Sequence, residues 1–577
     1  MNTDVLSLAP LSLPFTATLT MPGSKSHANR AIIAACLSEG QTTIYGATPC
    51  DDVALLVKNL ASIGFDIHYT NRKKGILIIS GGIPKKQRYR RPKELFCGNA
   101  GTTLRFLTSL ACIVPGEFVL TGNDAMHKRP IGDLVAALKA LGADIEDTNG
   151  YPPIHIRGGS LLGGVANLRT QKSSQFLTSL LLIAPVLPQG MTLKLVGSVP
   201  SQSYVALTRQ VMRDFGVPVQ MRNGVIHVLD TARYRTPRSY HVEGDHSAAG
   251  AFLVLAELTH STVSFSNLDP RSLQGDATLP KVIAQMRKKG QITIHCSDIP
   301  DQVMNLAVLA ACRDEVTKMS GAENLRYKES DRLSVLTNEL QKAGIRIEKN
   351  HDGVTVRKST IRGALLDPHD DHRMAFCFAI LGSLHPGIRI ENPGCVSKSY
   401  PHFFDDLQSL HSSSRPIAIV GMRGCGKSTL GKSLAHALSL KSFDTDRVFE
   451  RKHGNIRRFI EKHDWMKFRK EEERIVQACL QPGHVVSLGG GAIESKATRR
   501  RLREQAIVIH LKARSGELIE RLKKAKRPSL TALPLEQEVP MILKKRTPLY
   551  QEVAHFSLPN SGSINDAVRS LRALCSL

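Results

Sequence analysis

The sequence predicts an α/β protein built from more than one compact unit, and three features of the chain lead to this prediction. At 577 residues the chain is too long for one core, because single domains usually contain roughly 100–200 residues. A helical pattern that ends in glycine and continues into a short β-rich run recurs before residue 411. After residue 416, an apolar run leads directly into a glycine-rich loop and a helical pattern, as in a unit with a parallel sheet.

The recurring segments share one order of helix, glycine and strand. Each glycine suits a left-handed helix C-cap that feeds a strand. The segments cover residues 55–67, 134–145, 207–219, 282–294 and 335–347, and a sixth helix at 403–410 closes the series. The first four glycines recur at a nearly even spacing that exceeds the roughly 20–50 residues of solenoid repeats. We therefore expect repeated α/β subdomains, although an ordinary α/β fold could also repeat this order by default.

A polar tract at residues 411–416 divides the chain. Three serines between histidine, arginine and proline are typical of a domain joint. We expect an N-terminal part at 1–411, a linker at 412–415 and a C-terminal part at 416–577.

The excess of basic residues indicates which classes of partner this chain binds. The chain has 77 Lys and Arg residues against 51 Asp and Glu residues, a formal net charge of +26. Such an excess attracts nucleic acids, membrane lipids or phosphorylated metabolites. Aromatic residues make up only 5% of the chain, so base-stacking platforms are not indicated. We expect phosphorylated small molecules as partners, and no nucleic acid.

The cysteines and the apolar stretches indicate the compartment. The 11 cysteines are dispersed without a C-x-x-C pair, which favours reduced thiols over disulfides or a zinc site. The first residues lack the pattern of a signal peptide, and the most apolar stretch, at 180–186, is too short to cross a membrane. We expect a cytoplasmic protein with no membrane partner.

The loop at 421–428 has the pattern G-x-x-x-x-G-K-[ST] between an apolar run and a helical pattern. Its glycines allow backbone N–H groups to surround phosphates, and the N-terminus of the helix adds a positive field. Lys427 is expected to reach the β- and γ-phosphates of ATP, and Ser428 to ligate Mg²⁺. The residues expected to contact ATP are Gly421, Gly424, Cys425, Gly426, Lys427, Ser428 and Thr429.

Acids and cations follow this loop. Asp444 and Asp446 should point the same way at the end of a strand, because strand side chains alternate. One can serve Mg²⁺ and the other an acceptor hydroxyl. The glycine run at 489–491 allows a ligand to approach the backbone closely. Further cations are Arg469, Arg527 and Arg546.

In this order, the elements F-D-T-D, F-R, S-L-G-G-G, R-P and R-x-P-L-Y resemble shikimate kinase over residues 415–577. The resemblance implies Asp444 as a Mg²⁺ ligand and Arg527 as a lid arginine that closes on the transferring phosphoryl group of ATP. Asp446 is implied to orient the 3-hydroxyl or accept its proton. The residues implied to bind shikimate are Asp446, Arg469, Gly490 and Arg546. Nucleoside monophosphate and gluconate kinases share the loop but lack this combination.

The N-terminal part contains no such loop and no metal-binding spacing. Instead, small, basic and acidic residues recur at loop-like positions: P-G-S-K-S at 22–26, G-N-A-G-T at 98–102, S-S-Q-F at 173–176, K-E-S-D-R at 328–332 and D-H-R-M-A at 371–375. Arginine can bind phosphate and carboxylate bidentately, and acids beside cations can transfer protons. The set favours a site for two phosphorylated substrates.

In combination these motifs resemble 5-enolpyruvylshikimate-3-phosphate (EPSP) synthase across about residues 10–410. The resemblance implies two lobes of three α/β units each, at 21–238 and at 1–20 plus 239–411. It implies transfer of the enolpyruvyl group of phosphoenolpyruvate to the 5-hydroxyl of shikimate 3-phosphate, by addition and elimination, with release of phosphate. Both parts together predict a bifunctional enzyme of the shikimate pathway, which makes chorismate and aromatic amino acids. A transferase for UDP-N-acetylglucosamine is disfavoured by K-E-S-D-R and by the neighbouring kinase.

The resemblance also implies the residue roles. Asp301 would take the hydroxyl proton and Glu329 would handle protons at the methylene carbon, with Lys25 and Lys398 supporting the charge. The residues implied for phosphoenolpyruvate are Lys25, Gly101, Arg129, Arg332, Arg373 and Lys398. Those implied for shikimate 3-phosphate are Lys25, Ser26, Arg30, Ser173, Ser174, Gln175, Ser201, Tyr204, Asp301 and Lys328.

One residue departs from this family's pattern. Phe106 follows Arg105 where the family commonly has proline, at a position that influences sensitivity to glyphosate. A bulky side chain there could shift Gly101 and Thr102. We therefore expect reduced sensitivity to glyphosate.

Overall fold

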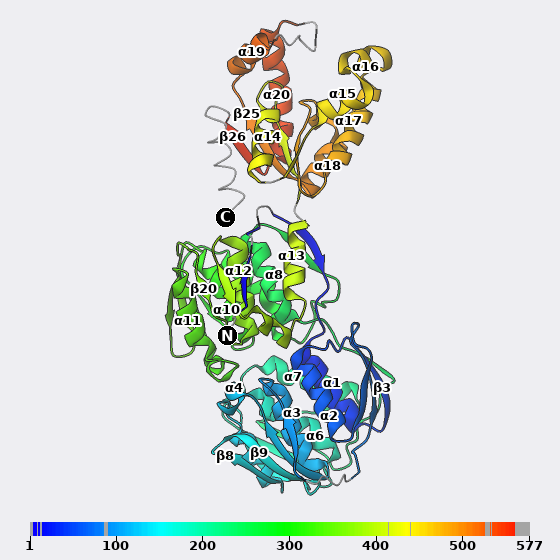
Figure 1. Ribbon diagram of the computed structural model, residues 1–577, viewed down its shortest axis with the longest axis vertical. Helices are drawn as coiled ribbons and strands as arrows, with labels where there is room; N and C mark the ends of the chain where they lie inside the picture. Colours follow the sequence, from blue (N-terminus) through cyan, green and yellow to red (C-terminus); the bar gives the residue numbers. More distant parts are fainter. Residues whose placement is uncertain are drawn as a thin grey trace. The chain divides into compact units, whose positions relative to one another are not determined.

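The computed structural model describes residues 4–8, 10–11, 14–85, 91–412, 415–438, 440–525, 531 and 533–559 (Figure 1). The chain forms two compact units. The first comprises Met1–Pro10, Thr18–Leu258 and Ser264–Phe404, and the second comprises Leu11–Ala17, Thr259–Val263 and Asp405–Leu577. Of the expected linker at 412–415, residues 413 and 414 lie outside the described part of the chain.

Four sheets of the first unit share one topology. In each, an edge strand pairs parallel with a central strand, and two further strands continue the sheet in antiparallel pairing. The sheets are β14 (Ser239–His241)-β3 (Gly40–Tyr45)-β5 (Ile76–Gly81)-β4 (Asp66–Asn71), β6 (Lys93–Phe96)-β7 (Gly116–Thr121)-β9 (Tyr151–Gly158)-β8 (Asp144–Thr148), β10 (Gly164–Arg169)-β11 (Met191–Val196)-β13 (Val225–Val228)-β12 (Met221–Arg222), and β16 (Ile292–His295)-β17 (Thr317–Ser320)-β19 (Val354–Arg357)-β18 (Arg346–Lys349). This shared topology confirms the repeated α/β subdomains.

Two smaller sheets accompany them. One has the order β1 (Val5–Ser7)-β21 (Arg389–Glu391)-β20 (Leu365–Leu366), and the other pairs β2 (Thr16–Leu19) with β15 (Thr262–Phe265). Strand β14, which follows the expected lobe boundary at residue 238, pairs with β3.

The glycines of the repeats mostly hold equivalent places. Four of the glycines lie between a helix and the fourth strand of a sheet, and their φ angles are between +84° and +100°: Gly64, Gly142, Gly216 and Gly344. The helices are α2 (Asp51–Ser62), α5 (Gly132–Ala140), α7 (Gln202–Asp214) and α11 (Arg332–Lys342). Gly290 is different: it follows α9 (Leu279–Met286), but the next strand, β16, opens the next sheet. The C-cap of α9 is Arg287, so the prediction of a helix cap at Gly290 is wrong, and Gly290 does not hold the place of the other four glycines in its repeat. This difference in place explains why Gly344 follows Gly290 sooner than the even spacing predicts.

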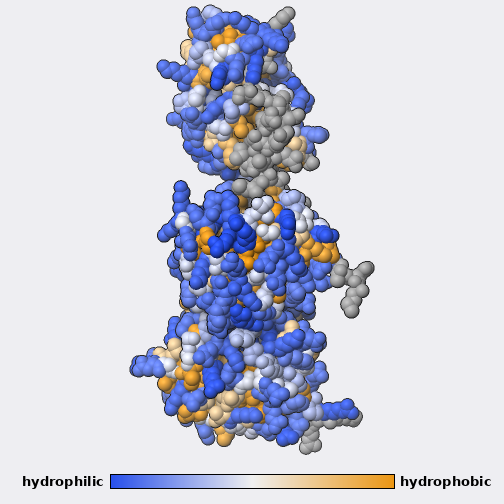
Figure 2. Space-filling view, turned by 90° about the vertical axis from the view of Figure 1, so that its left-hand side faces the viewer, coloured by the Kyte–Doolittle hydropathy of each residue, from blue (hydrophilic) through white to orange (hydrophobic). Residues whose placement is uncertain are grey.

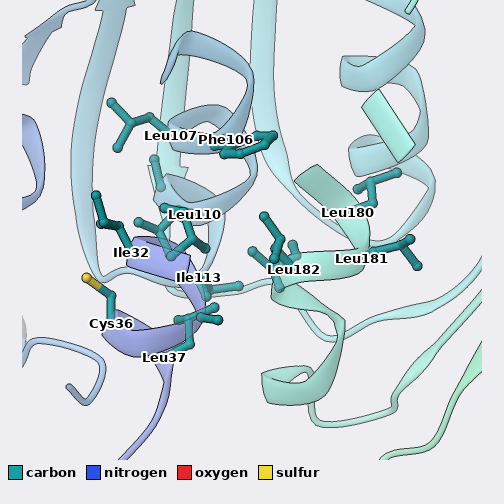
Figure 3. Close-up of a cluster of buried hydrophobic side chains, with 14 of the residues drawn as sticks. Ile32, Cys36, Leu37, Phe106, Leu107, Leu110, Ile113, Leu180, Leu181 and Leu182 are labelled. Carbon is teal, nitrogen blue, oxygen red and sulfur yellow. The ribbon is translucent and has the colours of Figure 1, made fainter. Parts of the chain in front are cut away.

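Two groups of buried helices form the interior of the first unit. One group is α1 (Lys25–Leu37), α3 (Gly101–Ile113) and α6 (Ser174–Ile183), whose apolar side chains meet as Figure 3 shows. The other is α8 (His246–Leu258), α10 (Val303–Ala311) and α12 (His372–Leu384), in which every residue of α12 is buried. Burial on all sides explains why these segments lack a polar face. The remaining short helices are α4 (Asp124–His127), η1 (Ala184–Val186), η2 (Gly275–Thr278), η3 (Pro300–Gln302), η4 (Glu323–Tyr327) and η5 (Pro393–Lys398), and α13 (Phe403–Ser412) begins in this unit and continues into the second.

The second unit contains one parallel five-stranded sheet, as expected. Its order is β23 (Lys441–Asp444)-β24 (His484–Ser487)-β22 (Ile417–Val420)-β25 (Ile507–Lys512)-β26 (Phe556–Pro559), and all neighbours are parallel. An apolar cluster lies on each face of the sheet. The helices are α14 (Lys427–Ala437), α15 (Thr445–His453), α16 (Ile456–His463), α17 (Trp465–Cys479), α18 (Lys496–Gln505), α19 (Ser515–Lys524), α20 (Leu535–Val553) and η6 (Ala492–Glu494).

The surface drawn in Figure 2 is mostly polar. On the face drawn in Figure 2, hydrophilic residues cover most of each unit, and apolar residues occur in small groups. Within the described part of the chain, no helix is both long and apolar enough to cross a bilayer.

Candidate active sites

One pocket of the first unit collects most of the residues predicted for the transferase reaction. Its walls come from the N-terminal ends of α1, α3 and α6 and from the segments that precede α7, α10 and α11, where backbone N–H groups of helix ends favour anions. The predicted residues that line it are Lys25, Ser26, Arg30, Gly101, Arg129, Ser173, Ser174, Gln175, Ser201, Tyr204, Asp301, Lys328, Glu329 and Arg332. Arg373 and Lys398 lie behind this lining: Arg373 Nη2 is 3.6 Å from Asp301 Oδ2, and Lys398 Nζ is 3.4 Å from Glu329 Oε1.

Arg332 connects three carboxylates beneath the pocket. Its side chain is only 2% exposed and donates from Nη1 to Asp301, from Nη2 to Glu329 and from Nε to Asp371, each at 2.7 Å. Burial by itself would lower the pKa of Arg332, but the three carboxylates raise it above its usual value. Arg332 therefore holds both predicted proton carriers in place.

The two predicted proton carriers are ionised in this arrangement. Burial raises the pKa of Asp301, but Lys328, Arg373 and Arg332 together hold it below its usual value. For Glu329, burial is likewise outweighed, here by Arg332 and Lys398, and its pKa lies well below the usual range. Both groups therefore have a carboxylate that can accept a proton, but the neighbouring cations make each of them a weak base in this arrangement.

Asp52 is a central residue of this site that the sequence analysis missed. Lys25 Nζ donates to Asp52 Oδ2 at 2.7 Å, and Lys398 Nζ lies 3.5 Å from Asp52 Oδ1. With Glu329 and Arg332, these residues form a chain of alternating charge through the site. An acid in the first turn of a helix is common at exposed positions, so only its 3% exposure reveals its role.

Arg105 is a second residue that was missed. It lines the pocket and donates from Nη1 to Gln175 Oε1 at 2.5 Å, while Gln175 Nε2 donates to Thr102 Oγ1 at 3.0 Å. Burial, with a contribution from Arg129, lowers the pKa of Arg105 to about 9. The signal was available, because Arg105 lies in the first turn and a half of the helix that the G-N-A-G-T motif opens.

Gly101 has a steric reason to be glycine. A Cβ atom at this position would lie 2.6 Å from Arg129 Cζ. The N-terminus of α3 and the Arg129 guanidinium can therefore approach each other only without a side chain here.

The loop at 421–428 in the second unit has the predicted strand–loop–helix context, between β22 and α14. Gly424 and Gly426 have φ of +81° and +96°, which favours glycine. Lys427 Nζ donates to the carbonyl oxygens of Gly421 and Met422, both at 3.0 Å, so its ammonium group lies within the loop. The remaining loop residues, Cys425, Ser428 and Thr429, lie at the end of the loop and in the first turn of α14.

Ser428 and Asp444 meet at the end of β23. The Ser428 hydroxyl donates to Asp444 Oδ2 at 2.5 Å, and Asp444 Oδ1 accepts from the backbone N–H of Asp446 at 3.1 Å. Two oxygen-bearing side chains at the phosphate loop match the few protein ligands that Mg²⁺ takes beside water and phosphate oxygens. Asp446 lies in the first turn of α15 rather than on the strand itself.

The predicted shikimate residues converge on the glycine run. A Cβ atom on Gly489 would clash with Asp446 Oδ1, and one on Gly491 would clash with the Arg469 guanidinium. Arg469 Nη1 donates to Glu472 Oε2 at 2.5 Å. Glu472 was not predicted as a site residue.

Arg546 and Arg527 are the two other arginines predicted for the kinase site. Arg546 Nη2 is 2.7 Å from Glu494 Oε1, a second acid that was not predicted, and Tyr550 donates to the carbonyl oxygen of Gly490 at 2.7 Å. Arg527, the predicted lid arginine, lies outside the described residues.

A pocket of buried cations and ionised acids on repeated α/β units, followed by a phosphate-binding loop on a parallel sheet, defines a transferase with two active centres. Residues 12–407 match the family model of EPSP synthase (3-phosphoshikimate 1-carboxyvinyltransferase), and residues 423–574 match that of shikimate kinase. The chain belongs to the EPSP synthase family, with a shikimate kinase domain at its C-terminal end, and is a bifunctional enzyme of the shikimate pathway.

Individual relatives agree. The 3-phosphoshikimate 1-carboxyvinyltransferase of Aliivibrio salmonicida is 35% identical over 426 residues, which cover 70% of this chain and 99% of that protein. The enzyme of the same name from Yersinia pestis is 34% identical over the same shares of both chains. A solved EPSP synthase from Acinetobacter baumannii shares the fold, with a TM-score of 0.58 at 24% identity over 71% of this chain and 98% of that one. The predicted family, fold class and activities are confirmed.

Proposed function

We propose that the second unit phosphorylates the 3-hydroxyl of shikimate and that the first unit then uses this product, through the residues described above. The observation that carries the transferase assignment is the pair of ionised acids, Asp301 and Glu329, that Arg332 holds at 2.7 Å each beside the pocket lysines. Two acids and several cations are what an addition–elimination reaction between two phosphorylated substrates requires.

In the addition step, the 5-hydroxyl oxygen of shikimate 3-phosphate forms a bond to C2 of phosphoenolpyruvate, and its proton passes to Asp301. C3 takes a proton from Glu329, which must first be protonated. Elimination then breaks the bond between C2 and the phosphate oxygen, so that inorganic phosphate leaves, and a proton passes from C3 back to Glu329, which restores the double bond. Glu329 handles the protons at C3, and because Arg332 and Lys398 stabilise its ionised form, a bound anion that draws these cations away would make its protonation easier.

The cations divide the two substrates between them. Lys25, Gly101, Arg129, Arg332, Arg373 and Lys398 would hold the phosphate and carboxylate of phosphoenolpyruvate. Shikimate 3-phosphate would bind on the side of the pocket formed by Ser26, Arg30, Ser173, Ser174, Gln175, Ser201, Tyr204 and Lys328.

In the kinase reaction, Lys427 would exchange its two loop carbonyls for phosphate oxygens of ATP. Ser428 and Asp444 would hold Mg²⁺, which neutralises phosphate charge when bound. Asp446 would accept the proton of the 3-hydroxyl while Arg469, Gly490 and Arg546 hold shikimate. The place of Arg527 in this scheme rests on the resemblance alone.

The organisation and location complete the proposal. Two lobes at 21–238 and at 1–20 plus 239–411 would enclose the transferase pocket, and residues 412–415 would link them to the kinase at 416–577. A cytoplasmic location is supported by the cysteines, none of which forms a disulfide in the described part of the chain.

The test uses the full chain. With shikimate, ATP and Mg²⁺, we expect formation of ADP, and no ADP when Mg²⁺ is omitted. With phosphoenolpyruvate and shikimate 3-phosphate, we expect release of phosphate without any nucleotide. Failure of either reaction in the wild-type chain rejects the corresponding half of the proposal.

A binding assay independent of turnover is also available. Trp465 is the single tryptophan of the chain, and its ring centroid lies 5.4 Å from Arg469 Cζ. Addition of shikimate alone should therefore change the tryptophan fluorescence, and an Arg469→Ala variant should show no change at the same concentrations.

A further inference from the structure

Arg30 is a buried cation without a carboxylate partner. Its side chain lines the transferase pocket and is among the largest fully buried ones of the chain. It donates from Nε to Thr208 Oγ1 at 2.9 Å and from Nη1 to the carbonyl oxygen of Ser26 at 2.6 Å, which are both neutral acceptors. Among the residues that the structure describes, Arg30 forms no ion pair. Its positive charge is therefore available to a bound anion.

Aromatic rings take the place of a counter-ion. Arg30 Cζ lies 5.7 Å from the ring centroid of Phe106 and 5.7 Å from that of Tyr204. Both distances are within the range in which the face of an aromatic ring attracts a guanidinium. Phe106 is 1% exposed and belongs to the core between α3, α1 and α6, where Figure 3 shows its side chain. Its ring is therefore held in place by packing and acts on Arg30 from behind the pocket wall.

A ring and a carboxylate differ in what they leave to a ligand. Arg332, which pairs with three carboxylates, has its charge already matched within the protein. A ring stabilises the cation through its quadrupole and adds no negative charge, so the attraction of Arg30 for an anion is kept. Arg105 repeats the arrangement, because its Cζ lies 5.3 Å from the ring of Phe176 and it also forms no ion pair in the described part of the chain. Two pocket arginines are thus backed by phenylalanine rings.

We infer that Phe106 is a positioning residue for shikimate 3-phosphate: its ring orients the Arg30 guanidinium and stabilises the charged form without neutralising it. This inference rests on the proposed function, since it takes the anion at Arg30 to be shikimate 3-phosphate. Proline, common at this position in the resembling family, has no aromatic face and cannot supply this support. Burial, which lowers the pKa of Arg30 to about 10, makes the support more valuable.

The test compares three variants. Phe106→Leu removes the ring and keeps a buried apolar side chain, Phe106→Tyr keeps the ring, and Leu110→Ala loosens the same core one turn farther along α3. In Phe106→Leu we expect the KM for shikimate 3-phosphate to rise about 2- to 30-fold, with kcat and the KM for phosphoenolpyruvate changed less than about 2-fold. In Phe106→Tyr and in Leu110→Ala, we expect the KM for shikimate 3-phosphate to stay within about 2-fold of the wild-type value.

Two results would overturn the inference: an unchanged KM for shikimate 3-phosphate in Phe106→Leu, or an equal rise in Leu110→Ala, which would show a general effect of core packing. Calorimetric titration with shikimate 3-phosphate alone makes the same comparison without turnover. A wild-type chain that releases no phosphate rejects the proposed function, whereas failure of the present inference is visible only in the comparison between variants.

Discussion

Replacement of Asp52 by asparagine should shift the alkaline limit of the transferase reaction to lower pH. Lys25 is buried, and burial is the largest influence on its pKa and lowers it; Asp52 and Glu329 more than offset this effect, so the pKa lies above its usual value. Asparagine removes the charge that lies 2.7 Å from Lys25 Nζ. An opposite charge at such a distance shifts a pKa by about 1–3 units, so burial should prevail in the variant and the pKa of Lys25 should fall by that amount.

The sign of the effect on activity follows. Lys25 must be protonated to bind an anion, and the protonated fraction is lost as pH rises through its pKa. In the wild type this loss lies above the usual lysine range, and in Asp52→Asn it should begin about 1–3 pH units lower. The variant should therefore be close to wild type at acidic pH, with kcat/KM for phosphoenolpyruvate falling progressively behind as pH rises.

The assay is release of phosphate from phosphoenolpyruvate at saturating shikimate 3-phosphate, measured across the pH range. Asp51→Asn is the matched control, since it removes the same charge from the same helical turn at an exposed position. ADP formation by the kinase serves as an internal measure of enzyme concentration in every sample. A pH profile of Asp52→Asn that is parallel to that of wild type, or a loss equal to that of Asp51→Asn, would refute the reasoning.

Four further predictions concern single positions. Lys427→Met should lower the rate of ADP formation at least about 100-fold and leave the rate of phosphate release unchanged, since the two reactions use separate residues. Loss of both activities would contradict this prediction. Gly101→Ala should raise the KM for phosphoenolpyruvate at least about 10-fold, because its Cβ would lie 2.6 Å from Arg129 Cζ; a KM within 2-fold of wild type would be the opposing result. Gly491→Ala should raise the KM for shikimate through a clash with Arg469, with the KM for ATP as the control. Glyphosate should inhibit the transferase more weakly than it inhibits relatives that have proline in place of Phe106. Half-inhibition at ordinary low-micromolar glyphosate concentrations would contradict this prediction.

The local motifs could be read from the sequence because neighbours in the chain determine them. The loop at 421–428 works through glycines at left-handed φ and the helix that follows at once. The glycines at 64, 142, 216 and 344 are C-caps for the same reason, and the structure confirms each of them. Gly290 shows the limit of this reasoning: α9 ends at Met286 with Arg287 as its C-cap, so Gly290 has a left-handed φ of +90° but is not the predicted helix cap, and the strand after it pairs with β17 in a new sheet.

The missed acids lack a signal in the sequence, whereas Arg105 follows a motif that could have identified it. Asp52, Glu472 and Glu494 carry ordinary charges on helices, and nothing next to them in the chain marks them as special. Asp52 gains its role from Lys398, which lies 3.5 Å away and is separated from it by more than half of the chain. Glu494 likewise pairs with the distant Arg546, whereas Glu472 pairs with Arg469 on its own helix. A charge becomes important in this way only when burial removes the water that would otherwise screen it.

The sequence by itself determined the class of both sites, the nucleotide loop, the repeated α/β units and the majority of the residues that line the transferase pocket. These features depend on local geometry and on motifs that occur together in one order. Only the tertiary structure decided the electrostatic state of the site: that Arg332 is shared by three carboxylates, that Asp52 stands between two lysines, and that Arg30 meets the rings of Phe106 and Tyr204 instead of an acid. The physical reason is that the energy of a buried charge depends on distances and desolvation, which are set by the packing of residues far apart in the chain.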